Sequence, residues 1–339
     1  MKRFLIKLSY TVLPIWIVWI GLMCYYNLTV LPNQHGDLGE VGRIPFKRFY
    51  EPPVCHDFPE VFYEDVKAPE KLRKKQADIL TCGDSFSQLG VQGYQNYLCG
   101  RGKTVLNFAP PQVFLTNPLQ NAFDLMRLNY IDSSNVKMLI VETSEKWLNR
   151  RISDFDSSHP QMTLLKEIDS HRTTERKAWT LKGANDFLLV RLGISIKHVV
   201  KKVELNRKVF SGTQGNRLYF YDEDLMDFSI GEKHELLLRN YVDKMRQMAI
   251  RKGIKVCFLI CPDKYDVYQD YIIDNPYPKK TINEDVKRIL GNRTDIVIAK
   301  EILMPKVKAG EKDIYYMDDT HWSFKAARYV ADYLFSIIP

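Results

Sequence analysis

The chain has 339 residues, of which 45% are apolar and 27% are charged, and its net charge is +8 at pH 7. This composition excludes an intrinsically disordered chain, because it provides enough apolar surface for a large core. The basic residues are spread along the chain among 41 acidic ones, without zinc-finger spacing or an aromatic RNA-binding pattern. We therefore expect no nucleic-acid partner.

The N-terminus predicts a membrane-spanning helix. Three basic residues lie within the first seven positions, and the next Lys, Arg, Asp or Glu is Asp37. About 20 apolar residues suffice to cross a bilayer, and basic residues before the span hold that end in the cytoplasm. We expect residues 8–31 to be an uncleaved, single-pass anchor with the rest of the chain on the periplasmic or extracellular side. A cleaved signal sequence and a lipoprotein site at Cys24 are the alternatives.

Three segments follow from this pattern. Residues 1–31 form the membrane anchor, and residues 32–70, rich in Pro, Gly and charge, form a linker that packs onto the domain. Residues 71–339 form one catalytic domain, interrupted at about 150–232 by a helical and basic insertion.

Short apolar runs alternate with helical patterns along this domain. Buried strands are expected at residues 77–82, 104–108, 138–141, 255–261 and 295–298. Helices are clearest at 232–253, which ends on a glycine, and after Ser323, a good N-cap. Within the insertion, residues 185–210 read as an amphipathic helix and 216–228 as a strand or extended loop. The alternation predicts a three-layer α/β/α fold around a mostly parallel sheet.

Ser85 is the candidate nucleophile. It lies in the stretch Gly-Asp-Ser directly after the first predicted strand, where reactive groups collect in open α/β sheets. Gly83 permits a tight turn, and the N-terminus of a following helix would offer N–H groups to an oxyanion. In most proteins the same tripeptide is an ordinary turn, so Ser85 needs a general base to be reactive.

His321 is the candidate base. It lies in Asp-Asp-Thr-His-Trp, just before the last predicted helix, with carboxylates two and three residues upstream. Either carboxylate could orient the imidazole, and we favour Asp319 over Asp318. The serine after the first strand and the histidine before the last helix are far more specific together than either is alone.

Three stretches resemble the SGNH hydrolase superfamily, and within it the branch related to bacterial alginate and exopolysaccharide O-acetyltransferases. They are GDSFS at 83–87, CPDKYDVYQDYI at 261–272 and YYMDDTHWS at 315–323, and the resemblance is expected to cover residues 70–339. It implies a Ser85–His321–Asp319 triad without a metal or cofactor. The Gly-x-Asn-Asp block of the superfamily is missing, and the serine precedes the Asp-x-His pair, unlike in the alginate proteins.

Five further residues are candidates for the oxyanion hole or for substrate contacts. Asn107 is the nearest amide to replace the missing block, and Glu142 lies at the strand end where that block is expected. Lys264 and Tyr268 follow another strand end, and Trp322, next to the histidine, could stack on a sugar ring. A loop ion pair for Lys264 and simple packing for Trp322 are the alternatives.

The resemblance implies a membrane-anchored O-acetyltransferase that moves an acetyl group through an acyl-serine to a hydroxyl of an exported polysaccharide. It also implies a multi-pass membrane-bound O-acyltransferase as the partner that supplies acyl groups. A carbohydrate esterase or deacetylase of the same fold, or a non-catalytic component of polysaccharide assembly, are the alternatives.

Overall fold

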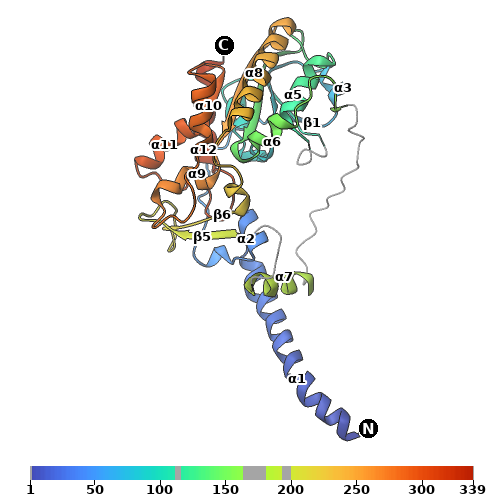
Figure 1. Ribbon diagram of the computed structural model, residues 1–339, viewed down its shortest axis with the longest axis vertical. Helices are drawn as coiled ribbons and strands as arrows, with labels where there is room; N and C mark the ends of the chain where they lie inside the picture. The colour runs from blue at the N-terminus through green and yellow to red at the C-terminus, as the bar shows by residue number, and fades with distance from the viewer. Residues whose placement is uncertain (1, 111–115, 163–180, 193–199, 339) are drawn as a thin grey trace.

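The protein combines a long N-terminal helix with an α/β body (Figure 1). The computed structural model describes residues 2–110, 116–162, 181–192 and 200–338. Helix α1 (Lys2–Tyr25) runs away from the body and continues through one π-helical and one 3-10 turn to Asn33. The stretch Ile6–Asn33 is long and apolar enough to cross a membrane, and its most apolar window is not buried against the protein.

A six-stranded sheet forms the centre of the body, with the order β1-β3-β2-β4-β7-β8, and every neighbouring pair is parallel. The strands are β1 (Glu64–Val66), β2 (Ala77–Cys82), β3 (Val105–Phe108), β4 (Val136–Ser144), β7 (Lys255–Cys261) and β8 (Ile296–Ile298). The predicted parallel α/β fold is therefore confirmed.

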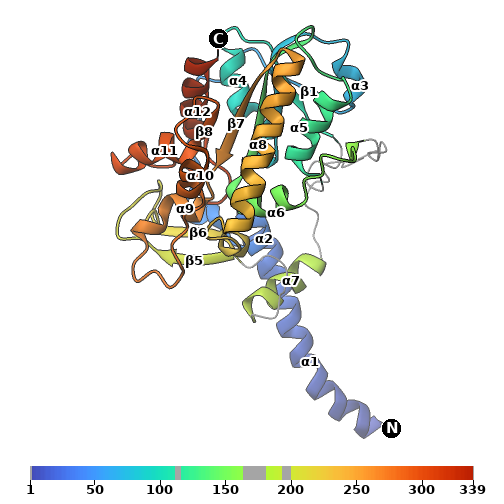
Figure 2. The same ribbon diagram turned by 45° about the horizontal axis from the view of Figure 1, so that its top comes forward.

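Helices cover both faces of this sheet (Figures 1 and 2). One face carries α4 (Tyr94–Cys99), α11 (Ala299–Lys308) and α12 (Phe324–Ile337); the other carries α5 (Pro118–Arg127), α6 (Leu148–Ser153), α8 (Glu232–Lys252) and α10 (Ile282–Leu290). Successive strand residues point to opposite faces, so Met138 and Ile140 join one apolar cluster while Leu139 and Val141 join the other. Burial on both faces explains why these strands are continuous apolar runs.

The predicted strands and the two clearest helices correspond to observed elements. Helix α8 ends at Gly253, whose φ of 66° is the left-handed conformation that glycine adopts at little cost. Helix α12 begins after Ser323, whose hydroxyl accepts a hydrogen bond from the Lys325 N–H at 3.2 Å. Such a cap stabilises a helix by about 1 kcal/mol.

The structure adds a strand to one predicted segment, and it shows that the amphipathic helix predicted at 185–210 was wrong from residue 200 on. Strand β1 lies inside the segment 32–70, which the sequence predicts to be a linker that packs onto the domain, and it extends the sheet beside β3. Within 185–210, helix α7 (Leu181–Arg191) covers only the start, and β5 (Val200–Glu204) pairs antiparallel with β6 (Arg217–Tyr221). The β-branched side chains of β5 suit a strand once the aromatic strand β6 lies beside it. Residues 193–199 lie outside the described part.

Three further α-helices of the described residues are short. They are α2 (Gly36–Gly42), α3 (Pro69–Leu72) and α9 (Lys264–Tyr268). Helix α2 follows the apolar helix and packs against β5 and β6, whereas α9 follows the carboxyl end of β7. Asp37 of α2 lines a cavity at the carboxyl edge of the sheet, where reactive groups are expected, and α9 borders that edge, whereas α3 lies toward the opposite edge, before β2.

Candidate active site

Ser85 lies in a tight turn at the carboxyl end of β2. The preceding Gly83 has no room for a side chain, since a Cβ there would lie 2.3 Å from both the Glu142 carboxylate and the Ser87 hydroxyl. Asp84 then caps a single 3-10 turn, because its Oδ1 accepts a hydrogen bond from the Phe86 N–H at 3.2 Å. This turn leaves Ser85 half-buried at the wall of a cavity.

The carboxylate of Asp84 ties this turn to the end of the neighbouring strand β4. Its Oδ2 accepts hydrogen bonds from Arg151 at 2.6 Å and from the Ser144 N–H at 2.9 Å. Burial favours a protonated Asp84, but the charge of Arg151 and these hydrogen bonds outweigh it and hold the pKa of Asp84 well below its usual range. Asp84 is therefore a permanent anion that holds the Ser85 turn in place.

Glu142, one of the predicted contact residues, supports the same turn from below. It is fully buried, and its Oε2 accepts hydrogen bonds from the Asp84 N–H and the Ser87 hydroxyl, both at 2.9 Å. Burial and the nearby charge of Asp84 raise the pKa of Glu142 well above its usual range, which favours the neutral form of the side chain. Glu142 does not line the cavity, so the structure places it under the serine turn.

His321 lies in the loop before α12 and is oriented by its own loop. Its Nδ1 lies 2.6 Å from Asp319 Oδ1, which also accepts the His321 N–H at 2.9 Å. Burial opposes the charged imidazole, but Asp319 and then Asp37 outweigh it and raise the pKa of His321. The His321 ring also meets the ring of Phe86, the neighbour of Ser85, with centroids 5.2 Å apart.

Ser85 and His321 line one cavity of about 1100 Å³ at the carboxyl edge of the sheet. With Asp319 on Nδ1, Nε2 is the imidazole nitrogen that remains to exchange a proton. A serine and an oriented histidine in one pocket have the parts needed for acyl transfer. The remaining wall consists of Asp37, Asp84, Phe86, Thr116, Asn117, Asn121, Ser144, Lys146, Trp147, Arg150, Arg151, Asp154, Gln161, Tyr221, Glu223, Asp224, Asp263 and Thr320.

Comparison with known families supports the same reading. Residues 218–339 match the family model described as the SGNH hydrolase-like domain of the acetyltransferase AlgX. These residues are therefore similar to the SGNH hydrolase-like domain of AlgX. The resemblance predicted from the motifs is thus confirmed, although the matched residues begin after Ser85, whereas the motifs predicted a resemblance from residue 70. No curated protein and no solved structure matches the chain.

Within the AlgX-like segment, the two candidate carboxylates face different partners. Asp319 binds His321, as described above, whereas Asp318 forms a hydrogen-bonded pair with Nδ1 of His35. Asp318 is also almost fully buried, and its backbone oxygen accepts the Leu38 N–H at 3.1 Å. Of these two carboxylates, Asp319 has the position of an orienting group for His321.

The structure does not bring Lys264, Tyr268 or Trp322 to the cavity wall. The buried Lys264 ammonium donates hydrogen bonds to the backbone oxygens of Met317 at 2.8 Å and Asp319 at 3.0 Å. Burial lowers the pKa of Lys264 to about 8. Tyr268 and Trp322 are fully buried aromatic packing residues, and the Trp322 ring lies 4.7 Å from that of Phe86 between centroids. Lys264 therefore stabilises the loop that carries His321 (the histidine loop), on the side away from the cavity.

Asn107 also points away from the cavity. Its amide donates to Asp65 at 2.9 Å and to the Ser87 backbone oxygen at 3.0 Å, and its oxygen accepts from the Thr81 hydroxyl at 2.7 Å. The amide thus links three strands of the sheet and has no donor left for an oxyanion. The helix N-terminus expected after Ser85 is likewise only one 3-10 turn.

Several cavity residues were not predicted from the sequence. Trp147, Arg150 and Arg151 follow the carboxyl end of β4, a position that itself points to a functional edge. Arg150 lies over the Trp147 ring at 5.6 Å from its centroid. Asp37 comes from α2, and no sequence pattern connects it to a histidine almost 300 residues away.

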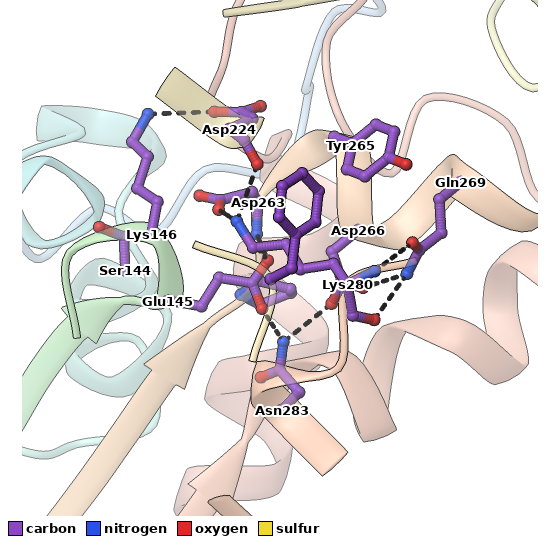
Figure 3. Close-up of polar contacts among 12 residues, drawn as sticks. Ser144, Glu145, Lys146, Asp224, Asp263, Tyr265, Asp266, Gln269, Lys280 and Asn283 are labelled. Carbon is purple, nitrogen blue, oxygen red and sulfur yellow. Dashed lines mark hydrogen bonds and ion pairs between the residues drawn. The ribbon is translucent and has the colours of Figure 1, made fainter. Parts of the chain in front are cut away.

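A buried ionic network lies behind the cavity wall (Figure 3). Lys280 donates to Asp263 at 2.5 Å and to the Asp224 backbone oxygen at 2.9 Å, and it lies 3.6 Å from Glu145. Asn283 joins Glu145 to Asp266, which in turn pairs with Lys300 at 2.7 Å. The network joins the segments that follow β4 and β7 beneath the cavity. Loss of one partner would leave an unpaired buried charge, so the pairs hold these segments together.

One group of described residues has the composition of a metal site. Ligand atoms of Asp37, Asp319 and His321 lie within 4.8 Å of one another. Both oxygens of Asp37 accept hydrogen bonds from Thr320, one from its N–H and one from its hydroxyl, and Asp319 Oδ1 accepts from the His321 N–H and lies 2.6 Å from its Nδ1. The three residues fit a hydrogen-bonded cluster around an imidazole better than a cation site.

Proposed function

We propose that the protein is a membrane-anchored, extracytoplasmic O-acetyltransferase that acetylates a polysaccharide through an acyl-serine. One observation carries the proposal: Ser85 lines the same cavity as His321, whose Nδ1 is bound by Asp319, in a chain with an AlgX-like domain. The anchor is the apolar helix, and the basic residues before it favour a cytoplasmic N-terminus.

The proposed reaction has two symmetrical halves. His321 Nε2 takes the Ser85 proton while Oγ attacks the acetyl carbonyl, and the imidazolium then returns the proton to the leaving group of the donor. A sugar hydroxyl next gives its proton to His321 and attacks the acetyl carbon. The acetyl–Oγ bond breaks, and Ser85 regains a proton from His321. Asp319 stabilises the imidazolium in both halves.

The cavity wall supports a sugar as the acceptor. The half-buried Trp147 ring and Tyr221 provide aromatic surface of the kind on which sugar rings stack, and Asn117, Asn121 and Thr116 provide polar groups beside it. We propose that a multi-pass membrane-bound O-acyltransferase is the partner that supplies acyl groups, because an enzyme outside the cytoplasmic membrane needs acetyl groups carried across it.

A two-part experiment on the full-length protein in detergent tests the function. A fluorophosphonate probe should label the wild type but not Ser85→Ala, and His321→Ala should lower the labelling rate by ~10⁴-fold. The protein is then incubated with an activated acetyl ester, with and without oligosaccharide. Acetylated sugar is expected, and Trp147→Ala should reduce its yield while leaving release of the ester leaving group nearly unchanged.

The other outcomes identify the alternatives. Free acetate without acetylated sugar, across the oligosaccharides tried, would make the protein an esterase, because water would replace the sugar at the same intermediate. Labelling that persists in Ser85→Ala, or no labelling and no turnover, would contradict the acyl-serine and favour a non-catalytic assembly component.

A further inference from the structure

The segment that leaves the apolar helix lies directly against the histidine loop. The Thr320 N–H and hydroxyl donate hydrogen bonds to Asp37, at 2.9 Å and 2.5 Å, and the Leu38 N–H donates to the Asp318 backbone oxygen at 3.1 Å. Gly36 has a φ of +63°, and a Cβ there would lie 2.1 Å from that same oxygen. The approach is therefore so close that only glycine fits between the two segments.

Asp37 also faces the reactive imidazole. Its Oδ2 lies 4.0 Å from His321 Nδ1, the atom that Asp319 binds, and both Asp37 and His321 line the cavity. Two carboxylates from distant parts of the chain thus face one edge of the ring. Opposite charges at this distance favour the imidazolium, which is the form that His321 adopts when it accepts a proton.

The other charged or titratable groups around this pair are few. Lys146 opposes the charge of His321, and Lys264 and the Tyr221 phenol lie near Asp37. Burial, and then Asp319, raise the pKa of Asp37 to about 6, so it carries its charge above that pH and loses it below. Above that pH both carboxylates favour the charged imidazole, against the opposing charge of Lys146.

We propose that Asp37 is a positioning residue for His321: it holds Thr320 in the histidine loop and raises the proton affinity of the imidazole. This inference rests on the proposed acyl transfer for its catalytic meaning. The segment after the membrane helix is then part of the active site, so the catalytic loop is tied to the point where the chain leaves the apolar helix.

Measuring the pKa of His321 tests this independently of activity. Full-length protein with ¹³C-labelled histidine is titrated by NMR in detergent micelles, and the His321 signal is assigned by its loss in His321→Gln. Asp37→Asn should lower the pKa of His321 by roughly one unit. The matched control Glu40→Gln removes an exposed carboxylate from the same helix, outside the cavity wall, and should leave that pKa unchanged.

Kinetics with an activated acetyl ester supply the second readout. Asp37→Asn should lower kcat about tenfold with little change in KM, and it should move the acid limb of the kcat/KM profile to lower pH. Asp37→Glu, which keeps the charge, should recover part of the loss. Thr320→Val, which removes only the hydroxyl that holds Asp37, should have the smaller effect on kcat.

An unchanged His321 pKa in Asp37→Asn overturns the proposal, as does a fall in kcat with no movement of the acid limb. If Asp37→Asn does not fold, Thr320→Val decides instead: an unchanged His321 pKa together with an unchanged kcat in that variant overturns the proposal equally. If the wild type neither labels nor turns over ester, the proposed function fails, while the titration still decides whether Asp37 acts on His321.

Discussion

Two aspartate–histidine pairs lie side by side in this molecule and differ in almost every physical respect. Asp319 and His321 form one pair within the loop before α12, and Asp318 and His35 form the other, between that loop and the start of α2. The first pair lines the cavity through His321, whereas the second does not. Asp318 and Asp319 are neighbours with the same chemistry, but the loop directs their side chains to different histidines.

Burial shows what each pair can do. The His321 side chain is 20% exposed and meets the cavity, and the Asp319 side chain is 27% exposed. The Asp318 side chain is only 1% exposed, but the His35 side chain is 45% exposed and lies in water on its outer side. The imidazole of the first pair is thus open to the cavity, whereas the second pair fastens the loop before α12 to the segment that precedes α2.

Asp319→Asn is expected to have the largest effect. An amide at this position favours the wrong imidazole tautomer and cannot stabilise the imidazolium, so kcat should fall by ~10⁴-fold. Turnover of an activated acetyl ester measures this, with thermal unfolding as the control for the fold. If Asp319→Asn and Asp318→Asn both leave the rate unchanged, the triad is wrong.

Lys264→Met should come next, because Lys264 holds the loop that carries both pairs. Losing its two hydrogen bonds to the backbone oxygens of Met317 and Asp319 should lower the free energy of unfolding by about 1–3 kcal/mol. We expect kcat to fall by roughly tenfold, since a displaced loop misplaces the imidazole. A stable variant with wild-type kcat would show that the loop needs no brace.

The same lysine predicts a pH dependence of stability. Its pKa in the folded protein is about 8, below the ordinary value of 10.5, so the unfolded chain binds more protons between these values. The free energy of unfolding contributed by Lys264 should therefore rise with pH from about 8 to 10.5. Unfolding curves of the wild type minus those of Lys264→Met isolate this rise, and a flat difference would contradict the burial of the ammonium.

Asp318→Asn should change kcat by less than about tenfold, because Asn keeps an acceptor for the loop and His321 keeps Asp319. The same ester assay that measures Asp319→Asn serves here. A loss as large as that of Asp319→Asn would reverse the roles of the two carboxylates.

His35→Gln should have the smallest effect. The hydrogen bond to Asp318 is the main cause that raises the pKa of His35, so its contribution to stability is full below the ordinary value of 6.5 and is lost as pH rises through the raised pKa. Because His35 is nearly half exposed, solvent screening limits this to at most about 1 kcal/mol. Thermal unfolding at pH 5.5 and pH 8.5 checks it, and an equal difference at both pH values would contradict the pairing.

Much of the architecture could be predicted from sequence. Continuous apolar runs marked β2, β4 and β7 because both faces of each strand are buried, and Gly253 and Ser323 marked the ends of two helices. Strand β1 was not predicted, because it has only three residues and two of them are acidic. Strand β5 escaped because its pattern also suits a helix until β6 supplies a partner.

By itself, the sequence determined the alternation of strands and helices, the apolar N-terminal helix, and the placing of Ser85 and His321 at opposite ends of the domain sequence. These are properties of local pattern and spacing. Only the tertiary structure decided that Asp319 and not Asp318 meets His321, that Arg151 holds the turn before Ser85, and that Asp37 joins the site. Each of these contacts depends on how loops distant in the sequence pack and which way their side chains turn, and no local pattern records that.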